Sequence, residues 1–431
     1  MIAEPAVERS TSASDSPVAV RGGWRVLTAL GFGYIGVYLC RKNLAVAVPL
    51  LQTAFSATKE QVGSIASAGT FAYAIGKLVN GVVVDRIGGR RGYLLSLVAV
   101  AFCGAGGALA PGLLGLMLFY SLNRFAGSAA WNAMVKLVPT WFGIARTATA
   151  IGVLSVSYVA GGVFATLLAR QVLAFGGGWR AVMGVPSIVL LGMTLLCAAF
   201  VRAGPALSNP ATTASSPAVV EPPMRDALII LLRKPQFLIC CGLSLTVTLM
   251  RESFNTWNVD FLTSIQSGQK SVATAALHSI GFDMAGAVAI LVTGLAYDRV
   301  RAGSRRWLIA GTLGLLAVVL AILPRTASAS PVLGAVLIGA AGLLVYGPFS
   351  LLSGVLAIES GGARLAATAA GCIDGVGYLA AILAGAALGR LLDVGGYALG
   401  FEVLSIVTAV SAFLALLLRP GHQPETPRVA R

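Results

Sequence analysis

The sequence predicts an all-α membrane protein with twelve transmembrane helices in two six-helix halves. Of its 431 residues, 57% are hydrophobic and only 11% are charged, a balance far outside that of soluble domains. Twelve apolar runs are each long enough, at about 20 residues, to cross a bilayer core about 30 Å thick as a helix. Outer-membrane strands would give shorter, alternating segments, so these runs favour helices.

The elements follow in chain order. We expect residues 1–23 to form a disordered cytoplasmic tail, because they lack the basic start, apolar core and cleavage site of a secretory signal. The N-terminal half covers 24–201, a cytoplasmic linker rich in Pro, Ser, Thr and Ala covers 202–235, the C-terminal half covers 236–418, and 419–431 form a second cytoplasmic tail. The spans are centred near residues 36, 72, 100, 124, 159, 190, 248, 285, 314, 344, 379 and 408.

The distribution of positive charge predicts the orientation. Twenty of the 31 Lys and Arg residues fall on the side of the tails and linker, and six fall on the other side. This asymmetry follows the positive-inside rule, so we expect a multi-pass protein of the inner (plasma) membrane with both termini in the cytoplasm. It also accounts for most of the formal net charge of +15, which therefore does not indicate a nucleic-acid partner.

The sequence contains no recognisable catalytic or metal-binding constellation. The six cysteines lie in predicted spans without metal-like spacing, and the only histidines are His278 and His422. We therefore expect no metal, no cofactor and no enzymatic activity. Energy for any transport must come from a gradient of an ion or of a counter-substrate.

A short motif recurs once in each half. GVVVDRIGGRR ends the second span, and GLAYDRVRAGSRR ends the eighth span 213 residues later. We expect its glycine to let helices approach closely, and its Asp and Arg to lock the cytoplasmic ends in one conformation and release them in the other. The alternative is an ordinary basic loop. The predicted gating residues are Gly81, Asp85, Arg86, Gly294, Asp298 and Arg299, and Glu359 is expected at the same interface.

The repeated motif and the six-plus-six layout resemble the major facilitator superfamily of secondary transporters. The resemblance implies the major facilitator fold, with a substrate site between the halves near the bilayer midplane. It also implies that Arg124, in the fourth span, has a coupling or structural role rather than a contact with the substrate.

Two arginines occupy matching places in the first and seventh spans. Arg41 precedes Asp85 by 44 residues, and Arg251 precedes Asp298 by 47. Because a charge in hydrocarbon is costly, such residues face a water-filled cavity and mark a substrate path. Two guanidinium groups facing one cavity predict a clamp for a dianion such as phosphate or paired carboxylates. The alternative for Arg41 is snorkelling to the outer interface.

Several neighbours support or complicate this clamp. Tyr34 and Tyr38 lie on the same helix face as Arg41, where a phenol can donate to a phosphate oxygen or pack against a sugar. Lys77 either adds a third cation or pairs with a carboxylate. Lys42 lies off the face of Arg41, so we expect it to snorkel or to serve a structural role.

Two carboxylates also lie within predicted spans. Glu252 directly follows Arg251, and Asp374 lies in the eleventh span. An intramembrane carboxylate indicates function. The open alternatives are a proton carrier, the partner of a cation in the empty site, and a contact to substrate hydroxyls or a substrate amine.

Five motifs in order resemble the organophosphate:phosphate antiporter family, which includes glycerol-3-phosphate and hexose-6-phosphate antiporters and sugar-phosphate exchangers. They are YIGVYLCRKN, GKLVNG, LNRFAGSAAW, Arg251 with Trp257 six residues later, and YGPFSLLSGVLAIES followed by GVGYL. The resemblance implies exchange of inorganic phosphate for a phosphate ester, with aromatic side chains around the cavity. Tyr158 stands where the best-known bacterial members carry a His, so it keeps a donor but cannot become cationic. The expected substrate-binding residues are Arg41, Arg251, Lys77, Tyr34, Tyr38, Tyr158, Trp131, Tyr346, Tyr378 and Asp374.

The sequence thus predicts a monomeric secondary transporter that exchanges an organic phosphate for inorganic phosphate by alternating access. Its partners are the anionic substrate, the phosphate counter-substrate and the bilayer. Two alternatives stay open: a proton-coupled symporter of a carboxylate or phosphonate, with Glu252 or Asp374 as its proton site, and a transporter-like sensor of sugar phosphate.

Overall fold

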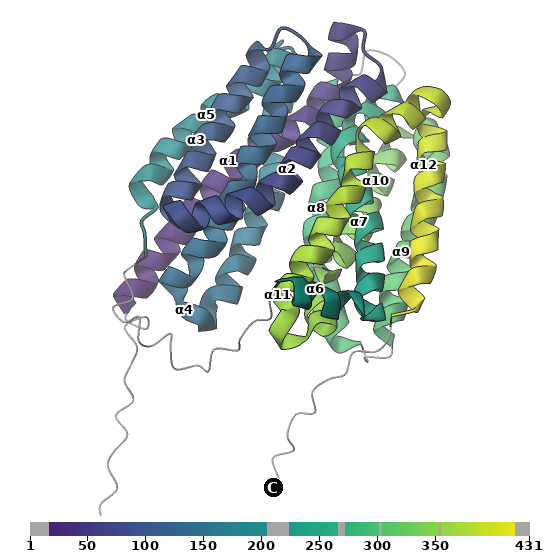
Figure 1. Ribbon diagram of the computed structural model, residues 1–431. Coiled ribbons are helices and arrows are strands. Elements are labelled where there is room, and N and C mark those ends of the chain that lie inside the picture. The colour runs from purple at the N-terminus through teal and green to yellow at the C-terminus, as the bar shows by residue number, and fades with distance from the viewer. Residues whose placement is uncertain (1–16, 205–223, 266–271, 301–303, 353–354, 419–431) are drawn as a thin grey trace, which may run out of the picture.

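The computed structural model describes residues 17–204, 224–265, 272–300, 304–352 and 355–418. Every element in these ranges is helical (Figure 1), which confirms the predicted class. The elements are α1 (Pro17–Phe55), α2 (Lys59–Ile87), α3 (Gly89–Leu109), α4 (Leu113–Ala174), α5 (Trp179–Phe200), α6 (Met224–Leu232), α7 (Pro235–Ser264), α8 (Val272–Arg299), α9 (Arg305–Ala329), α10 (Pro331–Leu352), α11 (Val355–Ala381), the 3-10 turn η3 (Ile382–Ala384) and α12 (Ala386–Leu416).

The helices do not match the twelve predicted crossings one to one. Ten stretches of the described chain are long and apolar enough to cross a membrane. One of them, Thr368–Leu416, holds two crossings, because Gly396 bends α12 with a φ of +64°. The 62 residues of α4 would span about 93 Å if straight, roughly three times the hydrocarbon thickness. Its second part, Ala150–Ala174, is among the ten stretches, whereas residues 113–142, where the sequence predicts another crossing, are not.

The two halves lie side by side (Figure 1). α1 to α5 pack on one another in the N-terminal half, and α7 to α12 do so in the C-terminal half. Between the halves, α2 packs on α12, α4 on α8 and α1 on α7. We call the end of the bundle that carries residues 202–204 and 418 the linker end, and the end that carries 56–58 and 393–396 the opposite end. The helices of the two halves separate toward the linker end (Figure 1).

The boundaries of the halves differ slightly from the sequence prediction. α1 already begins at Pro17, so its first turns fall within the predicted tail, 1–23. The predicted linker, 202–235, contains the short amphipathic helix α6, and the C-terminal half begins at Pro235, a residue suited to the first turn of a helix. Residues 205–223 of the linker and the predicted tail 419–431 lie outside the described chain.

The N-terminus of α2 joins the halves at the opposite end. Thr58 and Gln61 form a capping box, in which each side chain accepts a hydrogen bond from the backbone N–H of the other residue. Asp393, from α12, accepts the backbone N–H groups of Lys59 and Glu60 at 2.9 and 2.8 Å. A carboxylate from one half therefore caps a helix of the other half, where the helix dipole favours negative charge.

Close backbone packing continues this seam toward the middle of the molecule. A Cβ atom on Gly385 would lie 2.2 Å from the carbonyl oxygen of Gly63, so only glycine fits there. Beside it, the Ser67 hydroxyl donates to the Ile382 carbonyl at 2.5 Å and accepts the Ala386 N–H at 2.9 Å. α2 and the turn before α12 are thus held together by backbone contacts rather than by long side chains.

Candidate functional site

The two arginines predicted from the sequence meet in the middle of the bundle. Arg41 of α1 and Arg251 of α7 both donate to Oε1 of Glu252, at 3.2 and 2.8 Å. The three side chains are only 9 to 11% exposed. Because the arginines come from different halves, this carboxylate oxygen lies where a shared anion would lie. Of the roles considered for Glu252, it fills that of a partner for the cations in the site.

Arg251 is further held by aromatic groups. Its Nη2 also donates to the Tyr378 hydroxyl at 3.1 Å, and its guanidinium lies 4.0 Å from the ring centre of Phe349. Its Nε finds no hydrogen-bond partner among the described residues. A buried guanidinium with an unused N–H group has donor capacity left for an incoming anion.

An ion pair between the halves also joins Lys77 of α2 to Asp374 of α11, with 2.5 Å between Nζ and Oδ2. Of the two roles that the sequence allowed for Lys77, the structure displays the pairing with a carboxylate. The Lys77 ammonium lies 5.6 and 5.1 Å from the ring centres of Tyr73 and Tyr378. Both partners are more exposed than the arginines, at 29 and 22%, so this pair lies at a wetter part of the site.

Lys42 does not snorkel but makes buried contacts with the C-terminal half. Its Nζ donates to both carboxylate oxygens of Asp283 at 2.9 Å and to Oδ1 of Asn255 at 2.6 Å. The Tyr346 hydroxyl donates to the same Asp283 carboxylate at 3.1 Å. Lys42 is therefore the structural cation that the sequence allowed. Its partner Asp283 was not recognised in the sequence, because a lone Asp in an apolar run does not reveal which helix it will face.

The remaining predicted aromatic residues form a wall on the N-terminal half. The ring of Tyr34 lies 5.4 Å from that of Tyr38 and 5.6 Å from that of Trp131, and the ring of Tyr158 lies 6.1 Å from that of Tyr38. The Tyr38 hydroxyl accepts a hydrogen bond from Arg41 at 3.2 Å. These four aromatic residues form one cluster, which contacts the arginine of its own half through Tyr38.

Arg124 of α4 lies closer to the site than its expected structural role suggests. It is 4% exposed, and its guanidinium lies 4.7 Å from the ring centre of Tyr73. Together with Arg41, Lys42 and Glu252 it lines a small polar cavity of about 30 Å³. A phosphate ion would need this cavity to widen.

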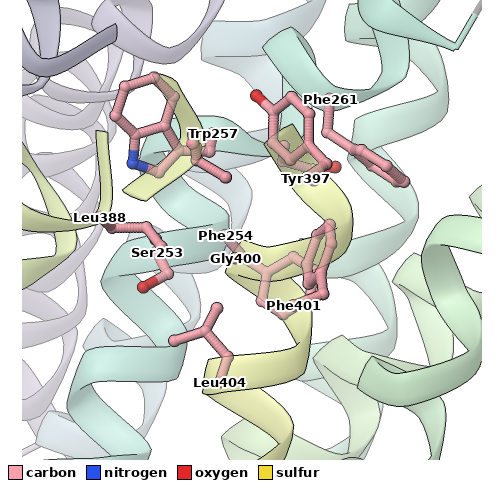
Figure 2. A pocket seen from close by; sticks show the side chains of 11 residues that line it. Ser253, Phe254, Trp257, Phe261, Leu388, Tyr397, Gly400, Phe401 and Leu404 are labelled. Atoms are coloured by element: carbon pink, nitrogen blue, oxygen red, sulfur yellow. The ribbon is translucent and has the colours of Figure 1, made fainter. Parts of the chain in front are cut away.

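A second small cavity, of about 20 Å³, lies between α7 and α12 (Figure 2). Aromatic rings from both helices surround it, among them Phe254, Trp257 and Phe401. The Trp257 indole N–H is already used, because it donates to the Ala384 carbonyl at 2.7 Å. This pocket is lined mainly by apolar groups, with the Ser253 hydroxyl, unpaired in the described part of the chain, among them, and none of the charged residues of the site lines it.

The gating residues predicted for the N-terminal half lie at the linker end. Asp85 pairs with Lys136 of α4 at 2.9 Å, within one half, and Arg86 is exposed. A Cβ on Gly81 would lie 3.7 Å from its nearest neighbour, the Asn132 amide, which is an ordinary contact. The expectation that Gly81 permits a close helix approach is therefore wrong for this conformation, because α2 and α4 are not in tight contact at that point.

The second copy of the motif is only partly described. Arg299 is exposed, whereas the surroundings of Gly294 and the side chain of Asp298 lie outside what the structure describes. Glu359, expected near the same end, pairs with Arg305 of α9 at 2.8 Å. The described motif residues thus make contacts within their own halves.

Comparisons with known proteins agree on one family. Residues 30–385 match the sequence profile described as "Major Facilitator Superfamily". A protein of Chlamydia pneumoniae named "Probable hexose phosphate transport protein" is 26% identical over 414 residues, which are 91% of this chain and 90% of that protein. The "Glycerol-3-phosphate transporter" of Bacillus subtilis is 25% identical over 443 residues and 98% of each chain.

A further relative and a solved structure complete the comparison. The "Membrane sensor protein UhpC" of Salmonella typhimurium is 24% identical over 421 residues, or 94% of this chain and 93% of that protein. The crystal structure of a bacterial homolog of the human lysosomal transporter Spinster superposes with a TM-score of 0.73. It covers 92% of this chain and 96% of its own at 16% identity, so it bears on the fold alone.

Proposed function

The chain belongs to the Major Facilitator Superfamily, and from that premise we propose that it exchanges an organic phosphate for inorganic phosphate across the membrane by alternating access. One observation carries the proposal: an arginine from each half donates to the same buried anionic oxygen, at 3.2 and 2.8 Å. Phosphate presents the same kind of oxygen and adds further oxygens that both guanidinium forks can engage.

The placement of the two arginines links binding to movement. An anion held by Arg41 and Arg251 belongs to both halves at once, so its binding energy differs between conformations in which the arginines are close and conformations in which they are apart. Only such differential binding can shift a conformational equilibrium. Both arginines come from one chain, which supports a monomer as the transporting unit.

The other predicted residues suit the organic part of the substrate. The aromatic wall of Tyr34, Tyr38, Trp131 and Tyr158 offers rings and hydroxyl groups beside Arg41. The more exposed pair of Lys77 and Asp374, together with Tyr378, and the hydroxyl of Tyr346 at Asp283 offer polar groups to substrate hydroxyls. The named hexose phosphate and glycerol-3-phosphate relatives support a phosphate ester as the substrate class.

We assign the protein to the plasma membrane with the linker end in the cytoplasm. The support is the excess of Lys and Arg residues on that side, twenty against six. In the described conformation the halves are joined at the opposite end and through the middle. Substrate would accordingly reach the site from the cytoplasm in this state.

The direct test is exchange in proteoliposomes. Vesicles that contain the purified protein and unlabelled phosphate are expected to take up labelled phosphate and to release phosphate when an external ester is added. A panel of hexose phosphates, glycerol phosphate, phosphonates and dicarboxylates identifies the substrate class. Absence of phosphate exchange by folded protein would overturn the proposal.

A second candidate is a proton-coupled symporter of an organic anion. The observation that favours it is the presence of carboxylates within the site, Glu252 between the arginines and Asp374 beside Lys77. A symporter would accumulate a carboxylate in vesicles without internal phosphate when an inward proton gradient is applied. A sensor, suggested by the relative named as one, would bind sugar phosphate but exchange none.

A further inference from the structure

Glu252 occupies the donors that a phosphate would need. Its Oε1 accepts from both Arg41 and Arg251, and its side chain is 9% exposed. A dianion clamped by both arginines must use the same guanidinium N–H groups. Glu252 and a bound phosphate therefore compete for one set of donors.

Arg124 lines the same small cavity as Glu252. It is 4% exposed and makes no ion pair within the part of the chain that the structure describes. A buried guanidinium without an anion is costly, because little water screens its charge. Arg124 and Glu252 line this cavity together with Arg41 and Lys42, so the carboxylate has in the same pocket a cation that is not yet paired with any described residue.

We propose that Glu252 is a built-in counter-anion that the substrate displaces. Without substrate it joins Arg41 and Arg251, and when phosphate takes these arginines, the carboxylate turns to Arg124. The inference rests on the proposed function, because it takes the displacing anion to be the phosphate of the substrate. Arg124 is then a positioning residue that acts through Glu252 and does not touch the phosphate.

The exchange of partners leaves neither the two clamp arginines nor Glu252 without a counter-charge in either state. With phosphate bound, Glu252 faces Arg124, and without it, the clamp keeps an internal anion that spans the halves as phosphate would. The carrier can therefore change conformation without substrate, whereas a clamp with two bare arginines would be held back. Net movement of phosphate accompanies exchange as a consequence.

A double-mutant cycle tests whether phosphate displaces Glu252 from the two arginines and whether the displaced carboxylate then pairs with Arg124. Phosphate affinity is measured by calorimetry on the purified native protein and on the E252Q, R124Q and E252Q/R124Q variants. E252Q removes the charge that competes with phosphate, so this variant is expected to bind phosphate about tenfold more tightly. R124Q leaves the displaced Glu252 carboxylate without a cationic partner and is expected to weaken phosphate binding about tenfold. In the E252Q background, R124Q is expected to change affinity by less than about twofold. E402Q, the same change at an exposed position of α12, leaves affinity unchanged.

Two results of the cycle would overturn the inference. Equal or weaker phosphate binding by E252Q contradicts displacement. Loss of binding by the double variant relative to E252Q means that Arg124 holds the phosphate directly. Thermal melting of each variant establishes that it is folded.

A measurement on the native protein keeps the inference testable if E252Q does not fold. Vesicles loaded with labelled phosphate, in a medium without counter-substrate, are expected to lose label more slowly than during exchange but clearly faster than protein-free vesicles. Rapid exchange without any net loss overturns the inference and leaves the proposed function intact. Absence of exchange itself would overturn the proposed function.

Discussion

At Arg41 and Arg251 the shape of the side chain matters as well as its charge. Each guanidinium reaches a shared oxygen while a second N–H group bonds a tyrosine, Tyr38 in one half and Tyr378 in the other. A lysine ammonium is a compact point charge that cannot reproduce this forked geometry. The first prediction tests this difference.

Arg41→Lys and Arg251→Lys are each expected to weaken phosphate binding, because the ammonium keeps the charge but loses the fork. Truncation of either arginine to Ala, which removes the charge as well, is expected to cost about 2–5 kcal/mol of phosphate binding. Calorimetric titration of the purified variants with phosphate provides the measurement. Arg325→Lys, the same change at an exposed position of α9, is the matched control. Native affinity in either clamp variant would show that the forks do not hold the phosphate.

Lys42 leads to a prediction about stability rather than affinity. Lys42→Gln leaves the Asp283 carboxylate, about 10% exposed, without its ammonium partner and is expected to destabilise the protein by about 3–5 kcal/mol. Lys136→Gln breaks a pair whose Asp85 side chain is 74% exposed and is expected to cost less than about 1 kcal/mol. Thermal unfolding in detergent compares the two variants, and the Lys42→Gln/Asp283→Asn double variant is expected to recover most of the loss. Equal melting temperatures for the two single variants would contradict a structural role for the Lys42 pair.

Residue type and spacing predicted the cations of the site but not the residues with which they pair. A cation within an apolar run is visible in the sequence because it is costly there, so Arg41, Lys77 and Arg251 could be singled out. Their partners depend on how one half rotates against the other, which periodicity within a single helix does not encode. The Lys42–Asp283 pair and the bridge made by Glu252 became visible only in the assembled bundle.

At the scale of helices, the opposite end is held by a contact that leaves no space. A Cβ atom added to Gly63 would lie 2.5 Å from the carbonyl oxygen of Gly385. A Cβ atom added to Gly385 would lie 2.2 Å from the carbonyl oxygen of Gly63. Real Cβ atoms do not approach backbone atoms so closely, so the helices must move apart to accept one. Overpacking of this kind costs about 1–3 kcal/mol, enough to change which conformation is populated.

Gly385→Ala is therefore expected to shift the protein away from the conformation that is closed at the opposite end. Spin labels on Ala54 and Val394, one in each half near that end, should report a longer distance than in the glycine protein. Gly192→Ala, on α5 with open space around the added Cβ, is the control and should leave the distance unchanged. An unaltered distance in Gly385→Ala would mean that the contact does not hold this end closed.

The elements themselves followed from composition, whereas their junctions did not. Apolar runs of about 20 residues are typical of helices that cross a bilayer, so most of the crossings could be predicted. α4 runs through a predicted break and α12 through another, and the bend at Gly396 depends on a positive φ that a Gly-Gly pair permits but does not demand. α6 lies in a stretch whose composition favoured an unstructured connector, but MRDALIILL is apolar enough to pack against α7 and α11.

For the whole molecule, the two halves share the site but not the linker end. The ion pairs Arg41–Glu252, Lys42–Asp283 and Lys77–Asp374 join the halves through the middle, and Lys59–Asp260 joins them near the opposite end. The described gating pair Asp85–Lys136 lies within one half. A rocking motion about the middle would close the linker end as the opposite end opens.

Phosphate is expected to drive that motion, because it offers several oxygens to an arginine from each half, whereas Glu252 offers both arginines only Oε1. Spin labels on Val83 of α2 and Leu295 of α8, both exposed near the linker end, should move closer together when saturating phosphate is added in nanodiscs. Labels on Ala54 and Val394 should move apart in the same experiment, because alternating access opens one end as it closes the other. Arg251→Lys is the control: its labels start at the native distances, but its single ammonium cannot bridge phosphate to the other half, so neither distance should change. A phosphate-induced change at only one end would contradict rocking of rigid halves, and a full response of Arg251→Lys would mean that the movement is triggered somewhere other than the arginine pair.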